Sequence, residues 1–156
     1  TFHLMRIFKI ISIIVLALTM SGLSYAQDLN AMLKMVQEDA SGAFVTLEYI
    51  VEIEGEDGVF KDKGVIEAQD NMWHLKGTLL EMYTDADGTW VLDNEAKEAY
   101  VEPAWSYDDL RTFYTSVVSA GSTLKVRSLD TVLSDKKPTD CFTPVLSEDW
   151  LVTDLR

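Results

Sequence analysis

Residues 83–101 constrain the fold of this chain most, because they predict three short strands joined by two tight turns. An Asp-Gly pair at 87–88 supplies the first turn, since glycine adopts a positive φ without a Cβ clash. Residues 94–97 supply a second, polar turn. If Asp93 pairs with Glu98, one face of this hairpin is wholly apolar, and a sheet must cover such a face. The predicted apolar face holds Tyr83, Trp90, Leu92, Ala99 and Val101.

The beginning of the chain has the pattern of a secretion signal. Arg6 and Lys9 form a positive region, an apolar run follows over 10–18, and a small-x-small motif ends at Ala26. We therefore expect a signal peptide over 5–26, cleaved before the mature domain. An uncleaved membrane anchor is the alternative, although the apolar run is short for a membrane span.

The remaining domain, residues 27–156, is strongly acidic. The chain has 26 Asp and Glu against 13 Lys and Arg, for a net charge of −13. Such a surface repels nucleic acid and anionic membranes, so we expect no nucleic-acid partner and only transient membrane contact. Cys141 is the only cysteine, so no internal disulfide is possible.

The first half of the domain predicts one helix followed by strands. Asp28 is the expected N-cap of an amphipathic helix that ends at 41–42. Strands are then expected over 44–54, 59–68 and 72–80, ahead of the hairpin. Because short polar turns join these strands, an antiparallel meander is expected.

The second half predicts a further helix and further strands. Ser106 with Asp109 three residues later resembles a capping box, and it begins a helix expected over 106–118. Strands are expected over 123–133 and 150–155, whereas 134–149 has no clear pattern. The resulting prediction is an α+β fold with helix, five strands, helix and two or more strands: a curved antiparallel sheet with covering helices.

Residue types that support catalysis are few. His74 is the only histidine of the predicted domain and is expected on the exposed face, opposite Trp73 and Leu75. The sequence Asp85-x-Asp87-Gly88 resembles the start of a calcium loop but lacks its closing ligands. We therefore expect no catalytic residues, no metal site and no cofactor, and an enzyme is the least favoured class.

Large apolar side chains at alternate strand positions predict instead a concave lining that could bind a hydrophobic ligand. The alternative is that these residues form an ordinary core with no space for a ligand. The expected lining residues are Leu47, Tyr49, Val51, Trp73, Leu75, Leu79, Tyr83, Trp90, Leu92 and Val101. The expected underside of a covering helix is Leu110, Phe113, Tyr114 and Val117.

Several of these features together resemble a known family. The signal, the first amphipathic helix, the run from 83 to 101 and the ending at 149–156 are similar to the LolA-like periplasmic carriers of outer-membrane lipoproteins, in a short Bacteroides-type form. Clear similarity covers about residues 42–102 and the C-terminal tail. The family commonly has an arginine associated with lid closure, and residues 69–74 contain none.

The resemblance implies a half-open β-barrel whose interior holds the acyl chains of lipoproteins. It implies a monomeric protein in the periplasm of a Gram-negative bacterium, with an inner-membrane lipoprotein export complex as donor and an outer-membrane acceptor. By this resemblance Trp73, Leu75, Tyr83, Trp90 and Leu92 line the pocket that binds the acyl chains. The helix over 106–118, which carries Leu110, is expected to act as a lid that moves off the sheet as the ligand enters. A periplasmic hydrophobic-ligand binding or sensor domain without transport is the alternative function.

Overall fold

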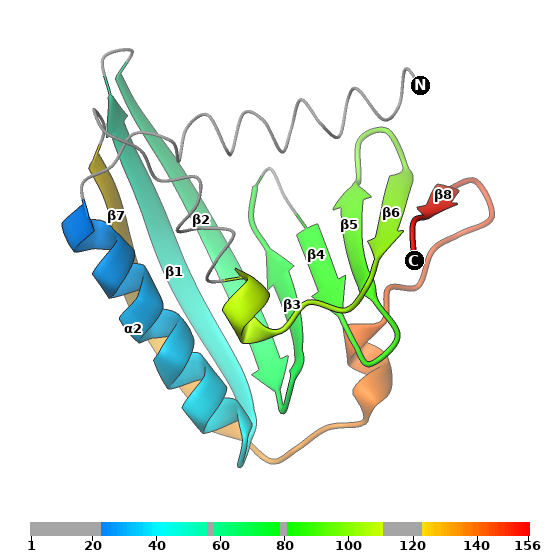
Figure 1. Ribbon diagram of the computed structural model, residues 1–156, viewed down its shortest axis with the longest axis horizontal. Helices are drawn as coiled ribbons and strands as arrows, with labels where there is room; N and C mark the ends of the chain where they lie inside the picture. The colour runs from blue at the N-terminus through cyan, green and yellow to red at the C-terminus, as the bar shows by residue number, and fades with distance from the viewer. Residues whose placement is uncertain (1–22, 56–57, 79–80, 111–122) are drawn as a thin grey trace.

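The computed structural model describes residues 23–55, 58–78, 81–110 and 123–156 (Figure 1). These residues form an α+β fold with one open, mixed sheet of eight strands in the order β7-β1-β2-β3-β4-β5-β6-β8. The strands are β1 (Phe44–Gly55), β2 (Gly58–Gln69), β3 (Met72–Lys76), β4 (Glu81–Thr84), β5 (Thr89–Asp93), β6 (Glu98–Glu102), β7 (Thr123–Ser134) and β8 (Leu151–Asp154). Because β7 and β8 lie at opposite edges and do not pair, the sheet is not a closed barrel.

The first helix, α2, spans Leu23–Ala40 and packs against β7, β1 and β2 (Figure 1). The helical spacing of Leu29, Met32, Leu33 and Val36 predicts an apolar stripe, and it is buried except at Met32, which is partly buried. The predicted N-cap at Asp28 is wrong, since the helix begins five residues earlier, in a segment without proline or glycine. Cleavage after Ala26 would fall inside this helix and stays a prediction.

The strands differ in length, and this gives the sheet two parts. β1, β2 and β7 each have 12 residues and form a long arm along α2. β3, β4, β5 and β6 have four or five residues each and pair in sequence order, antiparallel throughout. The predicted pairing of Asp93 with Glu98 is confirmed. Figure 1 shows that the short strands lie beside α2 rather than beneath it.

Two expectations about the sheet are wrong. β8 pairs with β6 in parallel, so the sheet is mixed and not purely antiparallel. The chain also reverses between Lys76 and Glu81, so the expected strand over 72–80 is wrong: β3 ends at Lys76 and β4 begins at Glu81. A single strand over 72–80 was expected because 72–76 and 79–83 are both rich in apolar residues.

The start of the second helix is confirmed. The backbone N–H and the hydroxyl of Ser106 both donate to Asp109 Oδ2, and the Asp109 N–H donates to Ser106 Oγ. The helical turn over 107–110 buries Tyr107 and Leu110 in the core. The predicted lid residues Phe113, Tyr114 and Val117 lie outside the described residues.

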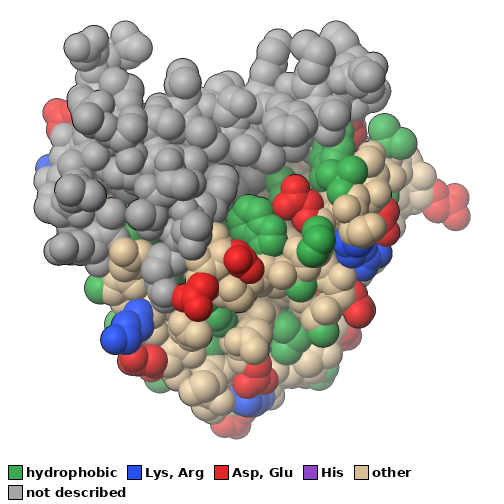
Figure 2. Space-filling view, viewed as in Figure 1, with side chains coloured by type: hydrophobic (Ala, Val, Ile, Leu, Met, Phe, Trp, Pro, Cys, Tyr) green, Lys and Arg blue, Asp and Glu red, His purple; other side chains and the backbone are tan. Residues whose placement is uncertain are grey.

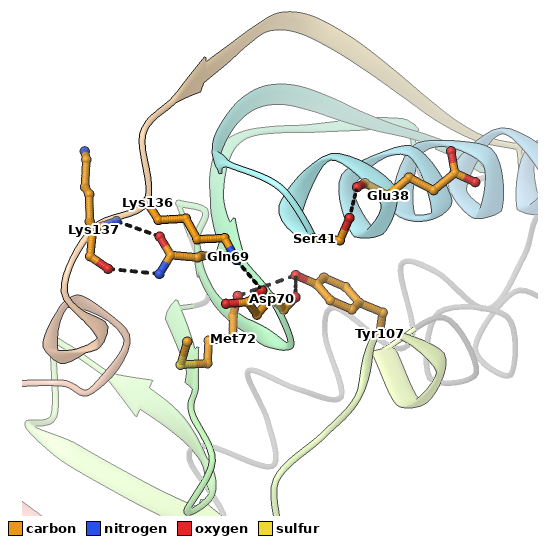
Figure 3. Close-up of polar contacts among 8 residues, drawn as sticks. All are labelled: Glu38, Ser41, Gln69, Asp70, Met72, Tyr107, Lys136 and Lys137. Atoms are coloured by element: carbon orange, nitrogen blue, oxygen red, sulfur yellow. Dashed lines mark hydrogen bonds and ion pairs between the residues drawn. The ribbon is translucent and has the colours of Figure 1, made fainter.

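The segment over 134–149, for which the sequence has no clear pattern, crosses to the face of the sheet opposite α2. It contains the short 3-10 helix η1 (Thr139–Phe142), whose Phe142 is buried with its ring centroid 6.0 Å from that of Phe44. Gln69 accepts the Lys137 N–H and donates its amide to the Lys137 carbonyl oxygen (Figure 3). Both faces of the sheet are therefore covered in part. Among the described helices, none has the length and hydrophobicity needed to cross a membrane.

Candidate functional site: the inner face of the sheet

The face of the sheet that packs against α2, which we call the inner face, carries a continuous apolar row. Each residue of the row is the direct partner of the next on the neighbouring strand, and all six are buried. Direct partners lie on the same face of a sheet, with Cβ atoms in contact range. The row therefore crosses six strands without a polar side chain other than the tyrosine at its end. It consists of Leu47, Ile66, Leu75, Met82, Val91 and Tyr100.

Only part of this row lies under α2. That helix contacts β7, β1 and β2 and buries Leu29, Leu33, Val36 and Ala40 against them. Tyr107 and Leu110, from the helical turn after β6, join the same core, and Trp105 packs against it partly buried. In Figure 2, hydrophobic and acidic side chains both reach the surface of this side of the molecule.

Beside the row, on the long arm, a glycine leaves space for a tyrosine ring. Gly64 is the direct partner of Tyr49, and a Cβ at Gly64 would lie 2.3 Å from the Tyr49 hydroxyl oxygen and 2.4 Å from its Cζ. The Tyr49 ring therefore lies across the β2 backbone, in space that only glycine leaves free. This contact buries Tyr49 on the inner face.

Polar side chains border the apolar row on both sides where it crosses β4, β5 and β6. On one side, the hydroxyls of Thr84 and Thr89 are 2.9 Å apart, and Thr89 Oγ1 accepts the Trp105 N–H at 2.8 Å. On the other side, Asp93 and Glu98 are cross-strand partners and both are buried. Asp93 Oδ1 accepts the N–H groups of residues 95 and 96. On β4, β5 and β6 the inner face is thus an apolar strip between two polar borders.

The turn between β2 and β3 ties the covering elements to this face (Figure 3). Asp70, at φ 53°, donates its N–H to the carbonyl oxygen of Ala40, the last residue of α2. The Asp70 carbonyl oxygen accepts the Tyr107 hydroxyl at 2.8 Å, and its carboxylate pairs with Lys136 at 2.8 Å. Three separate segments of the chain therefore meet at this turn.

The structure divides the ten predicted lining residues between the two faces. Leu47, Tyr49, Val51, Trp73 and Leu75 lie on the inner face, as expected. The expectation that Tyr83, Trp90, Leu92 and Val101 share that face is wrong, because Tyr83 pairs with His74 while Thr84 pairs with Trp73. Leu79 lies outside the described residues.

The reason for this error is the reversal after β3. Since Lys76 pairs with Glu81, odd-numbered residues of β3 pair with even-numbered residues of β4. Paired residues lie on the same face of the sheet, so the inner face carries odd-numbered residues on β3 and even-numbered residues on β4. The inner face of the short strands therefore includes Met82, Val91 and Tyr100, which the sequence pattern did not indicate.

The opposite face, which we call the outer face, holds a cluster of titratable residues. His74 stacks on Tyr83 with ring centroids 3.9 Å apart, and its nitrogens lie 3.5 Å from Glu67 and 3.6 Å from Glu81. The His74 side chain is 15% exposed, so the expectation of an exposed histidine is wrong although its face is right.

Two pKa values shift in this cluster. His74 lowers the pKa of Glu81, burial opposes this effect, and the Asn94 amide, which donates to Glu81 Oε2 at 3.3 Å, adds to it. Burial raises the pKa of Tyr83 to about 12, and the Glu81 charge contributes. Among the described residues no group of three His, Cys, Asp or Glu side chains is placed to hold a metal ion.

Comparisons with known proteins give no assignment. No protein-family model matches this chain, and no curated protein shows a significant match.

Proposed function

We propose that this protein is a periplasmic carrier that holds the acyl chains of lipoproteins on the inner face and ferries them from the inner to the outer membrane. The observation that carries this proposal is the apolar row across six strands, of which α2 covers only the part on β1 and β2. Together with the curvature of the open sheet, this arrangement supports a half-open barrel (Figure 1).

The shape of the row fits a linear hydrocarbon. Six neighbouring strands span five strand spacings, or about 24 Å, so the row is a long strip rather than a round pocket. A strip suits an extended chain, and its polar borders, such as the Thr84–Thr89 pair, disfavour sideways spread of an apolar ligand. Tyr49 and Tyr100 lie near its two ends.

The energetics require incomplete enclosure. Burying one methylene contributes about 0.8 kcal/mol, so a fully enclosed palmitoyl chain would contribute roughly 12 kcal/mol before the costs of binding. Several such chains would dissociate too slowly for transfer between two partners. An open sheet that contacts each chain mainly on one side lowers this affinity into a range that permits release.

The charge of the protein supports shuttling rather than membrane residence. A net charge of −13 disfavours lasting contact with anionic lipid headgroups. We propose transient contacts with an inner-membrane lipoprotein export complex and an outer-membrane acceptor, each made by the monomer. On this proposal the inner face binds its ligand and performs no catalysis.

Native mass spectrometry with a tri-acylated lipopeptide tests the proposal. We expect a stoichiometric complex with the acylated peptide and none with the same peptide lacking acyl chains. A clean mass for the free protein in both samples would contradict the proposal and indicate a filled core.

A hydrophobic-ligand binding or sensor domain without transport uses the same inner face. One observation favours this alternative. The β2–β3 turn is held by Tyr107 and Lys136, whereas the LolA-like carriers commonly use an arginine for lid closure, so the cover of the sheet is held differently. Transfer of bound lipopeptide to acceptor vesicles separates the two: a carrier transfers its ligand, and a sensor retains it.

A further inference from the structure

The Trp73 indole on the inner face has no hydrogen-bond partner among the residues that the structure describes. Trp73 lies on β3, in the middle of the sheet, and is 0% exposed. Within the described part of the chain its indole Nε1–H donates to no acceptor. An indole nitrogen is a donor only, so this group can be satisfied only by an acceptor brought close to it. Buried donors without an acceptor are rare in proteins and costly.

The neighbouring polar groups on the same face are satisfied. Thr84, the direct partner of Trp73, bonds to Thr89, and Thr89 also accepts the Trp105 N–H. The Tyr107 hydroxyl donates to the Asp70 carbonyl oxygen. Trp73 therefore differs from Thr84, Thr89 and Tyr107, which each make a hydrogen bond within the described part of the chain.

The position of this donor relative to the apolar row suggests its partner. Trp73 is two residues from Leu75, so it lies next to the row and on its threonine-bordered side. A hydrocarbon chain on the row offers no acceptor. The ester or amide that ends an acyl chain offers one strong acceptor, its carbonyl oxygen.

We propose that Trp73 Nε1–H donates a hydrogen bond to the ester or amide carbonyl oxygen of the bound acyl ligand, and so sets how far the chain enters the inner face. This inference rests on the proposed acyl-binding function and adds a polar specificity element to it. The hydrocarbon then lies along the row from Leu75, and the headgroup lies toward Thr84 and Thr89.

The test compares three probes of one chain length on the purified full chain: a palmitoyl ester, a palmitoyl amide and a hydrocarbon without a carbonyl. Their affinities are measured by displacement of a fluorescent fatty probe. Trp73→Phe keeps an aromatic ring but removes the donor. We expect affinity for the ester, the amide or both to fall about tenfold, in line with the loss of one hydrogen bond, and affinity for the hydrocarbon to stay unchanged. The two carbonyl probes distinguish an ester source from an amide source.

Trp90→Phe on the outer face is the matched control and should change none of the three affinities. The indole N–H resonance of Trp73, assigned by its absence in Trp73→Phe, should move downfield with a carbonyl probe and not with the hydrocarbon. An unfolding midpoint for Trp73→Phe equal to or above that of the wild type would show that the fold does not need the donor.

Three outcomes would overturn the inference. Equal loss for all three probes would mean that Trp73 contributes shape alone, and no loss for any would mean that its N–H is an orphan of an ordinary core. If the wild type binds none of the probes, the proposed function fails together with the inference. If the wild type binds all three and the Trp73→Phe affinities are unchanged, only the inference fails.

Discussion

Tyr107 donates a 2.8 Å hydrogen bond to the backbone carbonyl oxygen of Asp70 and so joins the helical turn after Ser106 to the turn between β2 and β3 (Figure 3). The same turn receives the end of α2, through the Asp70 N–H, and Lys136, through the Asp70 carboxylate. The two described elements that cover the inner face, α2 and the helical turn after Ser106, are thus tied to one point of the sheet. If the inner face binds acyl chains as proposed, this point fixes the cover while the apolar row beyond it holds the ligand.

The substitution Tyr107→Phe tests the importance of this hydrogen bond. Because a buried ring stays in place and only the hydroxyl is lost, we expect the free energy of unfolding to fall by about 1 kcal/mol. Urea denaturation measures this change. Tyr100→Phe is the matched control, since no hydrogen bond of its hydroxyl is seen among the described residues, and it should change stability little. Equal effects of the two substitutions would contradict the anchoring role of Tyr107.

The contact between Gly64 and Tyr49 predicts a coupled effect on stability. Gly64→Ala should destabilise the fold by roughly 1–3 kcal/mol, because the added Cβ overlaps the Tyr49 ring. In a Tyr49→Ala background the same substitution should cost much less. Gly42→Ala is the control: nothing lies within 4 Å of a Cβ at Gly42, so little change is expected. Additive costs for the Gly64 and Tyr49 substitutions would show that the ring moves aside freely.

The outer-face cluster predicts a contribution of Glu81 to acid sensitivity. A lowered pKa in the folded state means that ionised Glu81 stabilises the fold above the ordinary glutamate pKa. This stabilisation is lost as the pH falls through the folded value. Glu81→Gln should therefore flatten the fall of the urea midpoint between neutral pH and about pH 2. Asn94→Ala, which removes the amide donor, should have a smaller effect in the same direction. Identical pH profiles for wild type and Glu81→Gln would contradict the assignment.

Tyr83 predicts a late step in alkaline titration. Burial, the largest cause, raises its pKa to about 12, so folding favours the protonated phenol. That stabilisation is complete below the ordinary tyrosine pKa and is lost as the pH rises through about 12. Phenolate absorbance should show a step near this pH that Tyr83→Phe removes. A Tyr83→Phe titration curve that keeps the full amplitude there would assign the step elsewhere.

The local structure of the hairpin could be predicted from sequence, but the face it presents could not. Turn residues at 87–88 and 94–97 indicated the strand limits and the pairing of Asp93 with Glu98. The positive φ expected at Gly88 is wrong, because the described residues with positive φ are Gly58, Asp70 and Lys97. However, β5 is apolar on both faces, with Val91 between Trp90 and Leu92, because segments of the chain cover both sides of the sheet. Alternation of apolar and polar residues then carries no information on direction.

Two further features depend on contacts that are distant in sequence. The stretch between β7 and β8 has no helical or strand periodicity, so no sequence pattern indicated that β8 returns to pair in parallel with β6. Which residues of β4 share a face with Trp73 and Leu75 depends on the length of the reversal between Lys76 and Glu81. Because apolar residues lie on both sides of this reversal, the sequence pattern indicated one continuous strand. By contrast, the apolar stripe of α2 and the capping of the helical turn at Ser106 were predicted, since both are local.

The most direct test of the central claim is to map where an acyl chain lies on the protein. A lipopeptide with a photoreactive group near the end of its acyl chain is bound, irradiated and located by peptide mass spectrometry. Acyl binding on the inner face predicts crosslinks to residues of the apolar row, such as Leu75, Met82 and Val91. Crosslinks confined to outer-face residues such as Tyr83 and Trp90, or the absence of crosslinks, would contradict it.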